Sequence, residues 1–155
     1  MRLEPGQERL ICDYCGTVHL PQENEEGVRV LTELSPLLCP ICAISLVHAA
    51  VARHRILYCT QCRGMLVGMN TFLEIVHILR ARGAGTSETA RQPDWSEMDR
   101  RIRCPQCSQP MDAHLYGGGG NVIIEDCENC ELNWLDYGEL DRIVQAYDRE
   151  YASDV

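Results

Sequence analysis

Cys104-Pro105-Gln106-Cys107 and, further along the chain, Cys127-Glu128-Asn129-Cys130 decide the fold of this protein. A Cys-x-x-Cys pair forms a tight turn that points two sulfurs at one ion, and zinc takes four ligands in a tetrahedron. Two such pairs joined by roughly 15 to 20 residues are therefore a strong zinc signal, whereas a single pair is a weak one. This stretch predicts one zinc site made of four cysteines.

Every cysteine of the chain belongs to a pair of this kind. The 155 residues contain ten cysteines, in the pairs Cys12/Cys15, Cys39/Cys42, Cys59/Cys62, Cys104/Cys107 and Cys127/Cys130. A secreted disulfide framework also uses an even number of cysteines, but it does not need this uniform spacing. Zinc binding inside the cell is the better interpretation.

An internal repeat indicates which pairs belong together. Cys39-Pro40-Ile41-Cys42 matches Cys104-Pro105-Gln106-Cys107 at an offset of 65 residues, and the second halves, including Leu66 and Trp134, match at an offset of 68. The glycine run at 117–120 accounts for the difference. Each copy therefore has its own ligands, and we expect two Zn²⁺ ions per chain. The predicted ligands are Cys39, Cys42, Cys59 and Cys62 in the first copy and Cys104, Cys107, Cys127 and Cys130 in the second.

Within each copy, short β-rich runs and a helical period follow one another. Hairpin strands are expected at 46–51 and 56–58, and at 113–116 and 121–125. After the second cysteine pair, apolar residues recur at helical spacing. They are Phe72, Ile75, Val76 and Leu79 in one copy and Leu140, Ile143, Val144 and Tyr147 in the other. Capping boxes are expected at Thr71-x-x-Glu74 and Asp136-x-x-Glu139.

These observations predict a small, metal-stabilised α+β fold. It consists of tandem zinc ribbons (knuckle, β-hairpin, knuckle), each followed by a helix, with an extra N-terminal Cys-x-x-Cys knuckle. The expected divisions are an N-terminal knuckle and acidic segment at 1–36, a basic ribbon-helix unit at 37–82, a linker at 83–103 and an acidic ribbon-helix unit at 104–152. A unit of about 50 residues buries little apolar surface, so metal binding should supply much of its stability.

The second copy resembles the bacterial transcription-factor-IIB-type zinc-ribbon family. The resemblance rests on Cys104-Pro105-x-Cys107 with Met111, on Cys127-x-x-Cys130 and on the run Trp-Leu-Asp-Tyr-Gly-Glu-Leu at 134–140. The first copy keeps the four cysteines and Arg63-Gly64-Met65-Leu66 but lacks this run, so it looks like a diverged copy. The resemblance implies a zinc-binding ribbon and does not by itself imply a role in transcription.

The N-terminal pair Cys12 and Cys15 has no second pair of its own. It is a candidate third metal site, completed by His19 and one further side chain or shared with a second chain. It is equally open to remaining a dithiol. A ribbon formed with Cys39 and Cys42 is another alternative, but it would leave Cys59 and Cys62 without partners.

Charge is distributed unequally between the copies. The chain has a formal net charge of −9 and contains no lysine. Residues 37–82 hold five arginines and one glutamate, whereas 104–155 hold two arginines and eleven acidic residues. The net charge disfavours nucleic-acid binding, for which the best candidate is the Arg53-His54-Arg55 hairpin tip with Arg63, Arg80 and Arg82. The two units are expected either to attract each other, within one chain or between chains of a homo-oligomer, or to bind an acidic partner.

Trp134 is expected to cover a small core. Trp95 is expected to fix the linker to a domain, with an exposed anchor for a partner as the alternative. The sequence shows no apolar run of the roughly 20 residues that cross a membrane and no signal peptide, so a cytoplasmic location without membrane contact is expected.

The sequence also argues against an enzyme, because a catalytic zinc keeps an open position that four cysteines do not leave. The leading hypothesis is a non-catalytic zinc-ribbon adaptor that binds a protein partner, near transcription or translation machinery. One alternative is a redox- or zinc-responsive thiol switch with Cys12 and Cys15 as its trigger. A second alternative is a nucleic-acid-binding zinc ribbon.

Overall fold

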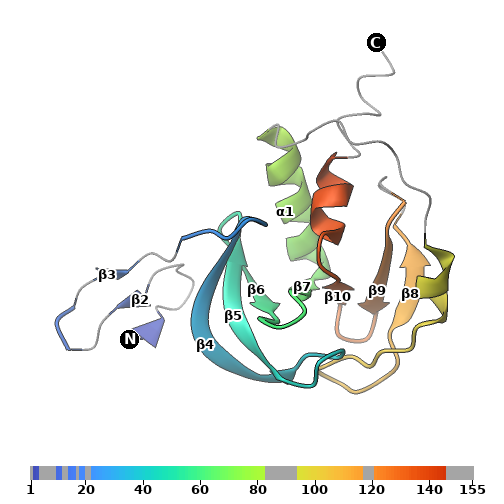
Figure 1. The fold of residues 1–155 in the computed structure, drawn as a ribbon, viewed down its shortest axis with the longest axis horizontal. Coiled ribbons are helices and arrows are strands. Elements are labelled where there is room, and N and C mark those ends of the chain that lie inside the picture. The colour runs from blue at the N-terminus through green and yellow to red at the C-terminus, as the bar shows by residue number, and fades with distance from the viewer. Residues whose placement is uncertain are drawn as a thin grey trace, which may run out of the picture.

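One antiparallel sheet of seven strands forms the centre of the molecule, in the order β4-β5-β6-β7-β10-β9-β8 (Figure 1). The computed structural model describes residues 2–3, 10–11, 14–16, 18–19, 22–82, 94–116 and 121–145. A second, three-stranded antiparallel sheet of β1 (Arg2–Leu3), β2 (Leu10–Ile11) and β3 (Val18–His19) projects to one side of the main sheet. Within the described residues, no helix combines the length and the apolar character that a membrane span requires.

The elements follow the sequence repeat. The first half contains β4 (Val28–Leu38), β5 (Ser45–Val51), β6 (His54–Tyr58), β7 (Met65–Gly68) and α1 (Met69–Ala81). The second half contains the 3₁₀-helix η1 (Trp95–Asp99), β8 (Asp112–Leu115), β9 (Ile123–Cys127), β10 (Leu132–Leu135) and a helix described over 139–145. The expected hairpins are present as β5/β6 and β8/β9.

The helix faces are those that the periodicity indicates, but of the two predicted capping boxes only half of the second one forms. Phe72, Ile75 and Val76 are buried on α1, as are the predicted apolar residues of the helix at 139–145. Glu139 accepts a hydrogen bond from the backbone N–H of Asp136 at 2.8 Å, which is one of the two bonds of a capping box. The Asp136 carboxylate accepts from Trp134 and Arg100 instead, and the N–H of Glu139 donates to the backbone oxygen of Asp136. In the first half, β7 continues directly into α1, so Gly68 is the N-cap and no side chain caps the helix. The box predicted at Thr71 is therefore wrong, because Thr71 already lies inside the first turn.

The two halves are joined strand to strand through β7 and β10. Leu66 lies opposite Trp134 and Met65 opposite Leu135 in an antiparallel register. Leu66 and Trp134 are also equivalent positions of the repeat, so an approximate two-fold axis passes through this pair. Side chains at the pair point to one face of the sheet and their neighbours to the other, as strand geometry dictates.

The division expected between residues 36 and 37 falls inside a strand. β4 pairs with β5 from Val28 to Leu38, and its Val28 and Leu31 side chains are fully buried. Residues 28–36 therefore belong to the main sheet, because these apolar side chains leave water only when the strand lies against the core.

Two apolar cores lie on the two faces of the sheet. One contains the buried sides of α1 and of the helix at 139–145, which lie next to each other (Figure 1). The Arg80 guanidinium donates to the backbone oxygen of Ile143 at 2.9 Å and so links these helices. The other core contains Leu46, Leu66, Met111 and Trp134 together with cysteines from both halves. The cysteine turns are thus packed against one shared core.

Candidate metal centres

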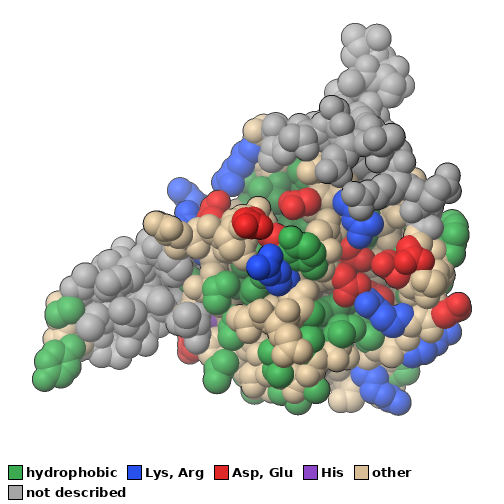
Figure 2. Space-filling model, viewed as in Figure 1, with side chains coloured by type: hydrophobic (Ala, Val, Ile, Leu, Met, Phe, Trp, Pro, Cys, Tyr) green, Lys and Arg blue, Asp and Glu red, His purple; other side chains and the backbone are tan. Residues whose placement is uncertain are grey.

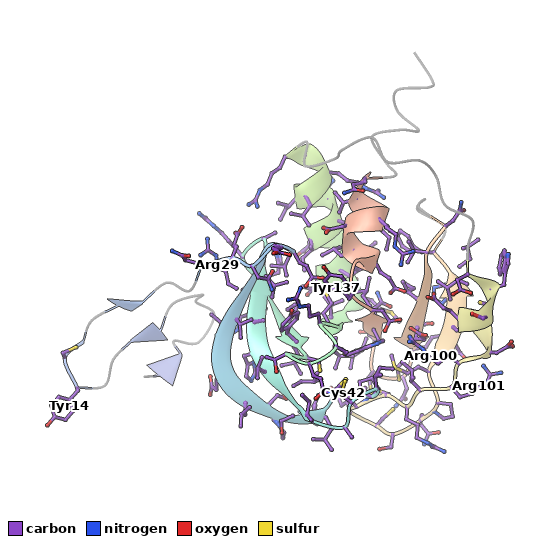
Figure 3. The ribbon with its side chains drawn as sticks, in the orientation of Figure 1. Tyr14, Arg29, Cys42, Arg100, Arg101 and Tyr137 are labelled. Carbon is purple, nitrogen blue, oxygen red and sulfur yellow. The ribbon has the colours of Figure 1, made fainter. Side chains whose placement is uncertain are left out.

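The first metal centre consists of Cys39, Cys42, Cys59 and Cys62, whose sulfurs all lie within 4.8 Å of one another. Two ligands come from the turn between β4 and β5, and two from the turn between β6 and β7 (Cys42 is labelled in Figure 3). The sulfurs of Cys39 and Cys62 are 3.7 Å apart. A tetrahedron with zinc–sulfur bonds of about 2.3 Å places sulfurs about 3.8 Å apart. A disulfide would need about 2.05 Å, so the thiols are arranged for a metal.

The second metal centre has the same construction. It consists of Cys104, Cys107, Cys127 and Cys130, again within 4.8 Å of one another. The sulfurs of Cys107 and Cys127 are 3.6 Å apart, close to the tetrahedral value for zinc. The structure thus groups the eight cysteines into two sets of four, and these are the sets that the sequence repeat assigns to separate sites.

All four turns share one backbone conformation. The residue after the second cysteine has a positive φ in every turn, although none of these residues is glycine. The values are 59° at Ala43, 63° at Arg63, 64° at Ser108 and 55° at Glu131. Left-handed backbone costs an ordinary L-residue roughly 1–2 kcal/mol, so this conformation persists because the rest of the turn imposes it. In the N-terminal pair, Gly16 follows Cys15 and has a φ of 71°.

Backbone amides point at the sulfurs and favour the thiolate form that binds metal. The N–H groups of Cys42 and Ile41 donate to the Cys39 sulfur at 3.3 and 3.4 Å. In the second centre, a hydrogen bond from the Gln109 backbone lowers the pKa of Cys107 to about 7. Burial acts in the opposite direction and raises the pKa of Cys39. Since zinc takes thiolates, these amides reduce the free energy needed to deprotonate the sites.

Trp134 lies between the two metal centres and is 0% exposed, as its predicted role over a small core requires. It belongs to the core that contains cysteines of both centres. It also lies against Gly64, where an added Cβ would be 2.3 Å from Trp134 Cζ2. Sequence reasoning did not assign a role to Gly64. Gly64 lies two residues after Cys62, and Trp134 lies in the equivalent strand of the other copy. These two positions together could have indicated that a small residue is needed at 64.

The run at 134–140 serves as an anchor between the two halves. The Trp134 indole donates to Asp136 Oδ1 at 3.2 Å, and Gly138 adopts a φ of 82° before the helix begins. Tyr137 is half exposed, and the Arg63 guanidinium lies over its ring at 5.4 Å from the centroid. The second half is thereby connected to the turn that holds Cys59 and Cys62.

The predicted third site falls mostly outside the described residues. This applies to Cys12 and to the side chain of His19, while Cys15 is described and exposed. The third metal site therefore stays a prediction. Trp95 is 58% exposed, which agrees better with an exposed anchor than with a side chain that fixes the linker to a domain.

Residues 103–146 match the TFIIB-type zinc-ribbon family model, described as "Transcription factor zinc-finger". The match contains the whole second metal centre, and the first centre lies outside it. No curated protein and no solved structure matches the chain. The family match and the two sets of four cysteines agree on zinc, so the chain has two zinc sites.

Proposed function

We propose that this chain is a non-catalytic zinc-ribbon module whose two metal centres hold a rigid, joined sheet for binding a protein partner. The observation that carries the proposal is the closure of both centres. Each has four cysteine ligands, and a four-coordinate zinc with four protein ligands leaves no position for water or substrate. The chemistry available to each centre is therefore structural.

The repeated construction supports two ribbons in tandem. Both halves have the same turn conformation, and the strands β7 and β10 pair at equivalent positions. Trp134 contributes to the packing at both centres. In this proposal the first half is a diverged ribbon that gave up the Trp-Leu-Asp run because the second half supplies one tryptophan to both.

Arginines of the first half contact the second half, which favours attraction within the chain. Arg63 lies over the ring of Tyr137, and Arg80 donates to the backbone of the helix at 139–145. At the hairpin tip, His54 is hydrogen-bonded to Glu74 at 2.8 Å. Arginines that are bonded internally contribute less to phosphate neutralisation, so the contacts of Arg63 and Arg80 support a protein partner over nucleic acid.

The surface proposed for the partner is an apolar patch of Leu34, Leu38 and Ile41. The first two side chains are 68% and 50% exposed on the edge strand β4, and Ile41 belongs to the first cysteine turn. Exposed apolar side chains on an edge strand are a feature that proteins usually avoid unless they are used. A partner that contributes an apolar face of its own would cover this patch.

Replacing zinc by Co²⁺ tests the closure of the centres. Co²⁺ in four-thiolate sites should give an absorption spectrum that stays the same when azide or cyanide is added, because no ligand position is open. A change in the d–d bands after addition, with cobalt still bound, would show an open position and would contradict a non-catalytic module.

A further inference from the structure

A cluster of acidic side chains lies apart from the cysteine centres, between η1, β9 and the start of the helix at 139–145. This acidic cluster consists of Glu97, Glu125, Asp136 and Glu139, of which Glu125 and Glu139 are 0% exposed. Figure 2 shows acidic side chains gathered with arginines on the side of the molecule that carries η1. Arg100, at the end of η1, bonds to Glu125 Oε1 at 3.0 Å and to Asp136 Oδ2 at 2.7 Å (Figure 3). Arg100 therefore bonds two of the four carboxylates, Glu125 and Asp136.

Three of these carboxylates are close enough to bind one ion. One oxygen each of Glu97, Asp136 and Glu139 lies within 4.8 Å of the others. Two ligands of the same ion cannot be further apart than twice the metal–oxygen bond, which is about 4.8 Å for Ca²⁺ and about 4.2 Å for Mg²⁺. Oxygens within this limit can bind one calcium-sized ion, whose flexible coordination accepts a range of oxygen–oxygen distances, whereas Mg²⁺ demands near-ideal octahedral geometry. Ligands made only of oxygen select hard cations over zinc.

The buried end of the cluster has unsatisfied oxygens. Among the described residues, Glu139 Oε1 and Glu125 Oε2 are buried and have no hydrogen-bond partner. The other oxygen of Glu139 is fixed by the backbone N–H of Asp136. A buried polar atom without a partner costs roughly 1–3 kcal/mol, and more when it is charged. The Glu139 carboxylate is thus buried within the cluster with half of its bonding capacity unused.

The raised pKa values of the acidic cluster also favour a positively charged ligand. Burial, followed by the charge of Asp136, raises the pKa of Glu139 to about 9. Burial raises the pKa of Glu97 as well, while Arg142 and Arg100 act against this rise. Without a cation, the cluster keeps a proton near neutral pH, and a divalent ion would take the place of that proton.

We propose that Glu97, Asp136 and Glu139 form a binding site for a hard divalent cation of the size of Ca²⁺, separate from the two zinc centres. Asp136 accepts hydrogen bonds from Trp134 and Arg100, but a carboxylate has about four lone-pair positions and can bind an ion as well. The ion would neutralise the carboxylates beside the start of the helix and, through Asp136, hold the run at 134–140 next to Trp134.

Calorimetric titration of the zinc-loaded, full-length protein with CaCl₂ tests the site, with MgCl₂ and MnCl₂ as parallel titrations. We expect one saturable Ca²⁺ site per chain, with zinc content unchanged. Glu97→Gln should weaken Ca²⁺ binding by at least about tenfold. Replacing a residue that only hydrogen-bonds to a metal ligand already lowers metal affinity by about that factor, and Glu97 would be a ligand itself. Asp99→Asn is the matched control, since Asp99 is exposed on the same 3₁₀-helix and is not in the acidic cluster.

A second readout separates binding from folding. Tb³⁺, which replaces Ca²⁺ in oxygen sites, should show luminescence excited through tryptophan, because Trp134 is bonded to Asp136. Ca²⁺ should displace this signal in the wild type and in Asp99→Asn. Saturable binding of none of the three cations, or equal Ca²⁺ affinity of the wild type and of folded Glu97→Gln, would overturn the proposal and leave a cluster held by protons.

Discussion

Replacing Gly64 by alanine tests whether the two metal centres share one packed core. The new Cβ would lie 2.3 Å from Trp134 Cζ2 and 2.8 Å from Cη2, and real Cβ atoms do not approach that closely. Trp134 is fully buried between the centres, so it cannot move aside without disturbing packing at both. Overpacking of this kind costs about 1–3 kcal/mol. For a chain of this length, each kcal/mol lowers Tm by about 2–4 °C.

The assay is thermal unfolding of Gly64→Ala at a fixed free zinc concentration, because zinc binding itself shifts Tm. Gly68→Ser is the control, since a Cβ at Gly68 meets Thr71 at an ordinary 3.6 Å and serine is a good N-cap. A double-mutant cycle with Trp134→Leu should show coupling, because the smaller side chain leaves room for the added methyl group. A wild-type Tm for Gly64→Ala, or strictly additive effects in the cycle, would refute the reasoning.

Three further predictions follow from the same packing. Glu139→Gln should stabilise the protein in buffer free of added cations, and the gain should grow as pH rises. The pKa of Glu139 is about 9 in the folded protein, so the native state binds one proton more than the unfolded state. The stability of the wild type therefore falls between about pH 4.5 and 9, and glutamine removes this loss. Urea unfolding at pH 6 and pH 9 measures this, and a Glu139→Gln effect that does not grow with pH would contradict it. Arg100→Met should lower the free energy of unfolding by about 3 kcal/mol, because it leaves Glu125 buried without its cation. Arg101 is exposed, so Arg101→Met should change this free energy little. Equal denaturation midpoints for the two variants would argue against a structural ion pair. Cys59→Ser should lose the first zinc and also lower the stability of the second centre through Trp134; zinc analysis combined with thermal unfolding shows whether the second centre is independent instead.

The metal ligands could be predicted because zinc coordination depends on local spacing. Each Cys-x-x-Cys turn places two sulfurs together whatever the rest of the chain does, and the repeat pairs the turns correctly. The buried faces of α1 and of the helix at 139–145 follow from helical spacing in the same way. These features are set by residues within a few positions of one another.

The joining of the two halves could not be predicted, because it depends on contacts far apart in the sequence. β7 and β10 have four residues each, which is too short for an alternating pattern to stand out. Their pairing determines the position of Trp134 against Gly64. The acidic cluster likewise combines η1, β9 and the anchor run, which come together only in the folded chain.

The strand β4 was missed for a different reason. Val28-Arg29-Val30 and the apolar residues after it have strand composition, but the acidic residues before them suggested one N-terminal segment. The strand was therefore divided at residue 36 although β4 continues to Leu38 and pairs with β5 on both sides of that point. The apolar and β-branched residues at 28–32 would have been a better guide than local charge.

The most direct measurement is the zinc content of the reduced protein by native mass spectrometry, in the wild type and in the Cys12→Ser/Cys15→Ser variant. The central claim assigns one zinc to each set of four cysteines, so the variant should hold two zinc ions per chain. A third ion in the wild type alone would place a further site at the N-terminal pair without changing that result. Fewer than two zinc ions in the variant would contradict the claim, because the eight remaining cysteines would then not form two zinc centres.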